Sequence, residues 1–225
     1  MNSLFLKRCA CIVTLILSLA ALGCGTKQSA SKSEEQPLST LDIEAREAKL
    51  KAFKPWRANG TIALESEAQG KFNVSFAWDV DEQGYDIKLF GPLGVQVYQL
   101  TQTSNSARLV SRSDSINGIN GEQLLSQALG VPVPISEMQT WAVGLPGDAS
   151  QVERDQSGRL ETMEVEQGGT TWDVEFDRYR VMEELDLPRT VLIESDGISI
   201  KMDFKKWARA EAADNNRLSI PGVGT

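Results

Sequence analysis

The feature that most constrains the fold is a set of segments in which apolar and polar residues alternate. The clearest segments span 72–78, 85–89, 172–176 and 198–204. Successive side chains of a strand point to opposite faces, so this alternation predicts antiparallel strands with one apolar and one polar face. Weaker patterns predict strands at 59–66, 95–102, 107–112, 160–167 and 188–195. The sequence therefore predicts a mainly β fold of about nine or ten strands.

A sheet this wide normally curls or closes, and its apolar face needs a cover. Helical patterns at 121–129 and 135–143, joined across Pro132 and Pro134, supply that cover, and a further helix is predicted at 41–53. The apolar face points inward, unlike that of a barrel spanning the outer membrane. We therefore expect an unclosed antiparallel β-barrel, a half-barrel covered by helices. Alternation alone does not decide between a packed interior and a cavity.

The first 23 residues read as an export signal. Lys7 and Arg8 precede an apolar stretch at 12–22, which is too short for a comfortable membrane span. The stretch ends in Ala21-Leu22-Gly23-Cys24, which is similar to a bacterial lipobox, in which the cysteine becomes the acylated first residue. We predict N-acyl and S-diacylglycerol chains on Cys24. An ordinary cleavable signal beside a cysteine is the alternative.

Beyond Cys24 the chain is polar up to Thr40, and residues 24–40 are predicted to form the acylated anchor and a flexible tether. Gly25 follows the cysteine, where an aspartate would retain a lipoprotein in the inner membrane. We therefore expect a lipid anchor in the outer membrane, facing the periplasm. The folded body is expected at 41–208, followed by a disordered tail at 209–225.

Composition excludes most catalytic chemistry. The 225 residues contain no histidine, and the three cysteines, Cys9, Cys11 and Cys24, all lie near the start. Histidine-dependent nucleophiles and zinc sites are thus ruled out. A net charge of −8 argues against nucleic acid as a partner. The segment 79–84 begins like a calcium loop, but Gln83 and Phe90 occupy ligand positions, so a hairpin turn fits better. We predict no enzyme activity, metal or cofactor.

One turn departs from the usual polar composition. The segment Phe90-Gly91-Pro92-Leu93-Gly94-Val95 carries turn residues around a leucine. Leu93 either folds back onto the core edge or stands exposed, ready to enter a membrane or a partner's groove. Burying one exposed leucine contributes about 1.5–3 kcal/mol, enough for transient docking only.

Several segments, taken in order after the lipobox, together resemble the LolB family of outer-membrane lipoprotein receptors. They are Trp56…Gly60, Phe76-x-Trp78, the loop 91–94, the segment 124–134, Trp141 to Ala149, Leu187-Pro188 and Lys201…Trp207. The resemblance covers about residues 41–208. It departs from the family pattern in the polar extension after Ala208.

The resemblance implies a hydrophobic cavity beneath the helices and a role in lipoprotein transport. Family members receive mature lipoproteins from a soluble LolA-like carrier and deliver them to outer-membrane phospholipid, without nucleotide or metal. Pro92, Leu93 and Gly94 match the family's membrane-insertion loop. We predict a monomer whose acyl-chain cavity is lined by Phe72, Val74, Phe76, Trp78, Ile87, Leu89, Trp172, Val174 and Ile200.

Two other functions remain open from the residues alone. A structural or assembly lipoprotein would have a solidly packed β core. A carrier of another lipid would bind ligands that lack an acylated cysteine.

Overall fold

The structure is a computed structural model that describes residues 39–67 and 70–210. It contains three α-helices, one short 3-10 helix and eleven strands. In chain order these are α1 (Thr40–Lys51), β1 (Trp56–Ser66), β2 (Gly70–Val80), β3 (Tyr85–Phe90), η1 (Pro92–Gly94), β4 (Gln96–Gln102), β5 (Ala107–Ser111), β6 (Ser115–Gly118), α2 (Gly121–Leu129), α3 (Ile135–Ala142), β7 (Gln151–Arg154), β8 (Leu160–Gln167), β9 (Thr170–Met182), β10 (Leu185–Ser195) and β11 (Ile198–Arg209).

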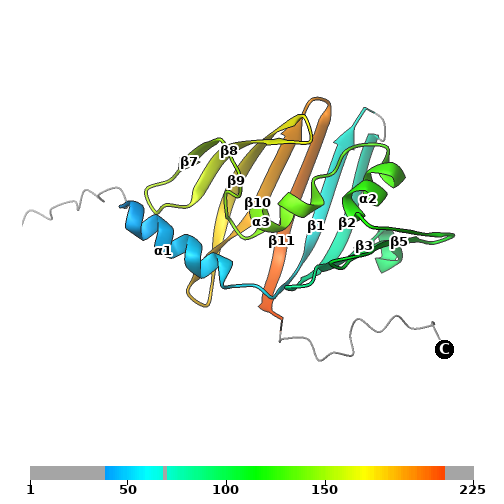
Figure 1. Cartoon of the computed structure of the whole chain (residues 1–225), viewed down its shortest axis with the longest axis horizontal. Coiled ribbons are helices and arrows are strands. Elements are labelled where there is room, and N and C mark those ends of the chain that lie inside the picture. Colours follow the sequence, from blue (N-terminus) through cyan, green and yellow to red (C-terminus); the bar gives the residue numbers. More distant parts are fainter. Residues whose placement is uncertain (1–38, 68–69, 211–225) are drawn as a thin grey trace, which may run out of the picture. The chain divides into compact units, whose positions relative to one another are not determined.

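All eleven strands form one antiparallel sheet with the order β6-β5-β4-β3-β2-β1-β11-β10-β9-β8-β7. The first and last strands of the chain pair at its centre, where Trp56 faces Arg209 and Ser66 faces Ile198. Strands β6 and β7 form the two edges and do not pair with each other in the described part of the chain. The sheet is therefore unclosed, with α2 and α3 lying over one face (Figure 1). The predicted mainly β half-barrel is confirmed.

Every predicted strand is present, and α2 has the predicted bounds. Two edge strands, β6 and β7, were not predicted. Each has four residues, too few to display an alternating pattern, and β6 contains Asn117 and Gly118, which disfavour strands. The signal, Cys24, nearly all of the tether and nearly all of the tail lie outside the described residues. The predicted domain boundaries remain predictions.

The sheet has two ends, which its turns define. The loop end carries the turns at 91–95, 111–115 and 195–198, and the α1 end carries those at 80–85, 102–107 and 182–185. Figure 1 shows the β10–β11 turn at the top of the view and the C-terminal end of β11 at the bottom.

Aromatic side chains fill the interior at the α1 end. Trp56 makes edge contacts with Trp78 and Trp207, at ring-centroid distances of 5.3 and 5.2 Å, and Phe204 stacks on Trp207 at 4.7 Å. Trp56, Trp78 and Phe204 are almost completely buried. Such contacts add about 0.5–1.5 kcal/mol per pair beyond area burial. This half of the interior is a packed core.

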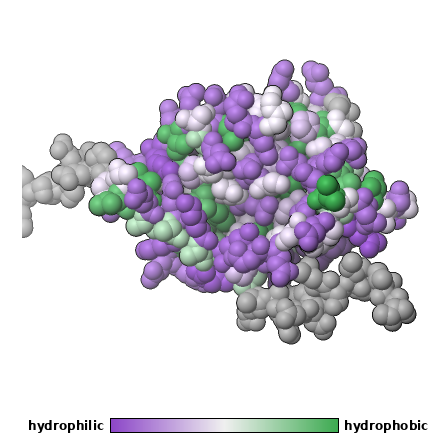
Figure 2. Space-filling view, viewed as in Figure 1, coloured by the Kyte–Doolittle hydropathy of each residue, from purple (hydrophilic) through white to green (hydrophobic). Residues whose placement is uncertain are grey.

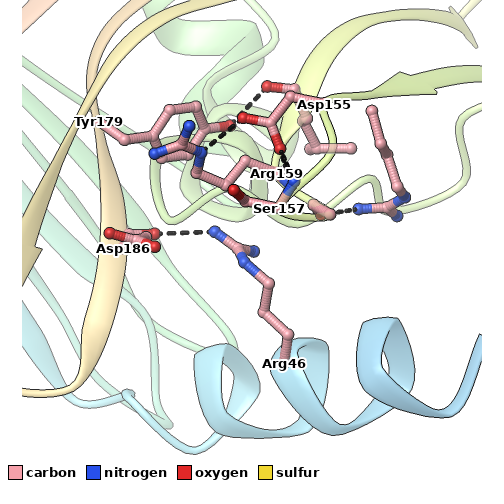
Figure 3. Close-up of polar contacts among 9 residues, drawn as sticks. Arg46, Asp155, Ser157, Arg159, Tyr179 and Asp186 are labelled. Atoms are coloured by element: carbon pink, nitrogen blue, oxygen red, sulfur yellow. Dashed lines mark hydrogen bonds and ion pairs between the residues drawn. The ribbon is translucent and has the colours of Figure 1, made fainter. Parts of the chain in front are cut away.

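Helix α1 is fastened to the sheet by its last turn and by polar contacts. Ser39 caps the start of the helix in a capping box with Asp42. Leu50 in its last turn and Phe53 just after its end are almost completely buried. Arg46 donates from Nη2 to the carbonyl oxygen of Asp186 at 3.0 Å and lies over the Tyr179 ring (Figure 3). A second link joins Arg154 Nη2 to Glu47 Oε1 at 2.6 Å.

Candidate functional site: an apolar cavity and an exposed leucine loop

The interior at the loop end holds an apolar cavity of about 40 Å³. Its walls come from both layers of the fold, because the sheet supplies one side and α2, α3 and their connection supply the other. Apart from the Tyr98 ring and the Met138 thioether, the lining is aliphatic or phenyl: Ile62, Leu64, Phe72, Val74, Ile87, Leu89, Leu100, Leu109, Leu125, Leu129, Val133, Ile135 and Ile200. Such a surface attracts hydrocarbon and offers little to a polar ligand.

The cavity opens toward the loop end. Four lining residues are only partly buried, Ile62, Phe72, Tyr98 and Leu129. Phe72 and Tyr98 lie near the loop-end termini of β2 and β4, and Leu129 ends α2, which begins at the α1 end beside Tyr85 and Gln102. Leu100, Leu109 and Ile135, by contrast, are at most 2% exposed. From the exposure of Phe72, Tyr98 and Leu129 we infer that the mouth of the cavity is at the loop end.

The nine residues predicted to line the cavity are divided by the structure into two groups. Phe72, Val74, Ile87, Leu89 and Ile200 are on its wall. Phe76, Trp78, Trp172 and Val174 are buried in the core but outside the lining. Phe76 and Trp78 belong to the aromatic packing at the α1 end, and Trp172 and Val174 lie on β9, three strands from β1. Alternation shows which side chains face the interior, but it does not show how far along the strands the cavity lies.

The prediction also omitted the part of the wall that the helices provide. Leu125 and Leu129 are four residues apart on α2, and Ile135 and Met138 are three apart on α3. This spacing puts each pair on one helix face. The sequence therefore contained a signal for these residues, because both helices had been expected to cover the apolar face.

The loop between β3 and β4 presents Leu93 to solvent. Its side chain is fully exposed, while Val95 is 44% exposed. Leu93 has φ 63° and ψ 16°, a left-handed conformation that costs a leucine roughly 1–2 kcal/mol. The bond from Gly91 N to Val95 O, at 2.9 Å, closes the loop beneath it. Leu93 thus does not fold back onto the core, and Pro92, Leu93 and Gly94 stand at the same end as the mouth.

Gln102 fastens the start of α2 to the sheet. Its Oε1 accepts from Gly121 N at 2.6 Å, and its Nε2 donates to the carbonyl oxygens of Ser106 and Ile119 at 3.2 and 3.3 Å. At the far end of α2, Ser126 Oγ accepts from Val133 N at 3.3 Å. The segment 121–142 is therefore a cover whose start is attached to the sheet by Gln102 at the α1 end, away from the mouth. We call this segment the lid.

Replacing Gln102 with leucine should loosen the lid. The Gly121 N–H would lose its acceptor in a part-buried position, which costs about 1–3 kcal/mol. We expect a lower urea midpoint and faster amide exchange along α2 than in β1 or β11. Gln127→Leu, at an exposed position of the same helix, is the matched control. Unchanged exchange in α2 would contradict the role given to Gln102.

Three acidic side chains meet where the lid helices begin. Burial, Asp148 and Glu122 together raise the pKa of the Glu137 carboxyl above its ordinary 4.5. Glu122 Oε2 also accepts from Ser136 N, at 3.5 Å. A folded-state pKa above the unfolded one means that the folded protein binds more protons, so this contribution to stability falls as pH rises through the folded pKa.

Glu137→Gln should therefore stabilise the protein at neutral pH. The gain should shrink as pH is lowered toward the ordinary glutamate pKa, where Glu137 itself becomes protonated. Urea midpoints of wild type and variant, measured from pH 4 to pH 8, test this. The exposed Glu161→Gln is the control. A variant less stable than wild type at pH 7 would show that the carboxylate is needed for packing.

The described residues contain no helix that is both long and apolar enough to cross a membrane. Residues 39–67 and 70–210 also contain no group of three or more acidic residues arranged to hold a metal ion. One face of the molecule is mostly hydrophilic, with hydrophobic side chains showing in small groups, one of them over α2 (Figure 2).

Comparison with known proteins identifies relatives of the chain. The chain is 26% identical over 208 residues to the outer-membrane lipoprotein LolB of Klebsiella pneumoniae strain 342, covering 92% of this chain and 98% of the relative. It is 24% identical over 203 residues to the outer-membrane lipoprotein LolB of Pectobacterium atrosepticum, covering 89% and 96%.

Among solved structures, the fold is similar to that of a domain from Vibrio parahaemolyticus, named as a proposed outer membrane lipoprotein-sorting protein. The TM-score is 0.51 at 12% identity, over 78% of this chain and 94% of that one. The family model for the outer membrane lipoprotein LolB matches residues 54–207, which include β1, the cavity, the leucine loop and the lid. The chain therefore belongs to the LolB family of outer-membrane lipoproteins, as the resemblance had predicted.

Proposed function

We propose that this chain receives mature lipoproteins from a LolA-like periplasmic carrier, holds their acyl chains in its cavity and inserts them into outer-membrane phospholipid. Membership of the LolB family gives it a role in the sorting of outer-membrane lipoproteins. One observation carries the finer proposal, namely that the apolar cavity opens at the end where Leu93 is fully exposed. A cargo chain leaving the mouth thus emerges beside the residue best suited to enter a bilayer.

The cavity must enlarge to hold an acyl chain. At about 40 Å³ it is far smaller than the roughly 300–1,000 Å³ of typical small-molecule sites. The sheet is held by continuous hydrogen-bonded ladders, whereas the lid is attached mainly by side chains and its start at Gln102. We therefore assign the enlargement to the lid, which swings at its mouth-side end as Leu125, Leu129 and Met138 exchange contacts with the sheet for contacts with the ligand.

The main energetic requirement of transfer is that the acyl chains never enter water. In this proposal an apolar route meets that requirement without a cofactor. Each methylene group moved into water costs about 0.8 kcal/mol, so a long chain costs on the order of 10 kcal/mol. A continuous apolar route from carrier to cavity to bilayer avoids that cost. A cavity that binds acyl chains somewhat more tightly than the carrier's cavity does then drives the handover. No enzyme activity, metal or nucleotide is required.

The anchor in this proposal is Cys24, with N-acyl and S-diacylglycerol chains. Residues 25–38 then join it to the capped start of α1. Fully extended, these 14 residues reach about 46–50 Å. A monomeric body on such a tether can turn either end of its sheet toward the membrane.

A handover assay tests the proposal. The mature chain with Cys24→Ser is mixed with LolA-like carrier loaded with a lipoprotein, and cargo on each protein is measured by pull-down; outer-membrane vesicles are then added. We expect cargo to move to this protein and then to the vesicles. If cargo never leaves the carrier, the receptor function is wrong. If the chain instead extracts phospholipid as readily as lipoprotein, it is a carrier of another lipid.

A further inference from the structure

Cationic side chains gather where the outer face of the sheet meets the end of α1. At the α1 end, Lys51, Lys54, Arg180, Lys205 and Lys206 form a basic patch, and no carboxylate pairs with any of them within residues 39–67 and 70–210. All are exposed except Lys54, which is half-buried.

Contacts between neighbouring elements make the basic patch continuous. Arg180 Nη1 donates to the carbonyl oxygen of Lys205 at 2.7 Å, which joins β9 to β11. Arg209 Nη1 donates to the carbonyl oxygen of Ala52 at 3.3 Å, which brings the end of β11 beside Lys51. Of the nearby carboxylates, Glu183 is paired with Arg209 at 3.1 Å, and Asp177 and Asp203 are paired with Arg178 at 3.0 and 3.8 Å. Val181, near the end of β9, is 68% exposed.

The same face is acidic toward the loop end. Glu164 faces Asp173, and Asp173 faces Glu194, across three neighbouring strands. Like charges in directly opposed positions destabilise a sheet. No lysine or arginine of the described chain forms an ion pair with these three carboxylates. Toward the loop end, strands β8 to β10 thus carry unpaired negative charge, whereas the cations of that end, Lys71, Lys88 and Lys201, lie on the other strands.

We propose that the basic patch binds an anionic phospholipid surface. Lysine and arginine near such a surface each contribute about 1 kcal/mol, whereas the acidic rows are repelled by it. The proposed lipid tether joins the folded body at the start of α1, the helix that ends at Lys51. Val181 adds an apolar side chain that can enter the interface.

Binding through this patch orients the molecule. The mouth and Leu93 are at the loop end, so a body lying on its α1 end turns the mouth away from its own membrane, toward the periplasm. The usefulness of that orientation for receiving cargo rests on the proposed function, but the binding itself does not. The chain then has two membrane contacts at opposite ends. The basic patch holds the protein on the membrane before cargo arrives, and Leu93 enters the bilayer when cargo is delivered.

Vesicle partitioning tests the inference. The mature chain with Cys24→Ser is spun with neutral phosphatidylcholine vesicles and with vesicles containing about one-third phosphatidylglycerol. We expect binding only to the anionic vesicles, weakening as salt is raised. Arg180→Gln, Lys205→Gln and Lys206→Gln together should lower the partition coefficient at least about tenfold.

The control removes the same charge elsewhere on the sheet. Lys71→Gln, Lys88→Gln and Lys201→Gln together should leave the partition coefficient within about twofold of wild type, although net charge changes equally. If both triple variants lose binding equally, net charge and not the patch is responsible. If neither loses it, the inference is wrong. Thermal unfolding checks that each variant folds, and the single variant Lys206→Glu replaces a triple variant that does not.

Orientation is measured separately with a fluorophore on a single cysteine. A label at Val181 should be quenched by brominated lipid, and a label at Lys71 should not. Quenching at both positions, or only at Lys71, would overturn the assigned orientation.

If the patch variant binds vesicles normally but no longer captures cargo from the carrier, the basic patch contacts the carrier and the membrane inference is wrong. If handover fails while vesicle binding holds, the proposed function alone is wrong.

Discussion

Replacing Leu93 with asparagine should leave capture of cargo unchanged and slow its delivery to vesicles at least tenfold. The apolar side chain contributes about 1.5–3 kcal/mol when buried in the bilayer, which corresponds to a factor of about 10 to 150. Asparagine adopts the left-handed conformation of this position more readily than leucine does, so the loop keeps its shape. The handover assay with vesicles added in its second stage measures both steps.

Two further variants isolate the contribution of the side chain. Leu93→Phe keeps an apolar group at the tip and should deliver cargo. Ile119→Asn removes an exposed apolar side chain elsewhere and should also behave as wild type, since Ile119 is 80% exposed between β6 and α2. Equal delivery by wild type and Leu93→Asn would show that the loop does not enter the bilayer.

Replacing Phe72 with glutamate should abolish capture. Phe72 lies at the mouth and is only partly buried, so the carboxylate can reach water in the free protein. With acyl chains in place it would have to be desolvated, which costs several kcal/mol. We expect cargo on the protein to fall more than a hundredfold in the first stage of the assay.

The neighbouring residue provides the control for this substitution. Asn73 is exposed on the opposite face of β2, so Asn73→Glu adds the same charge to the same strand without touching the cavity. It should capture cargo as wild type does. Retained capture by Phe72→Glu, with its fold confirmed by circular dichroism, would place the acyl chains somewhere other than this cavity.

Much of the fold could be predicted because its signals are local. Alternation in β2, β3, β9 and β11 reflects a sheet with one buried face, and that signal does not depend on knowing the partner strands. The lid helices were predictable for the same reason. The pairing of β1 with β11 was not, because strands separated by more than 130 residues leave no joint pattern in a single sequence.

The candidate site was predictable only in part. Alternation shows that Val74 and Trp78 both face inward, but only Val74 borders the cavity. The difference arises from what packs opposite each residue. Trp56 meets Trp78 and closes that half of the interior, whereas Val74 lies where the aliphatic lid leaves space. Packing across the sheet is a property of the tertiary structure. Leu93, by contrast, was identifiable because an apolar residue in a turn of glycines and proline conflicts with local composition.

The central position of the β1–β11 pair also determines when the protein can first be active. Strand β11 is the last of the eleven to be synthesised, and until it pairs with β1 that strand is an open edge and the cavity lacks Ile200. Contacts between residues so distant in the chain form late and slowly. A chain that lacks β11 therefore has neither a complete cavity wall nor a protected sheet. The cavity wall and a sheet without an open central edge therefore exist only once the whole chain has been made and has folded.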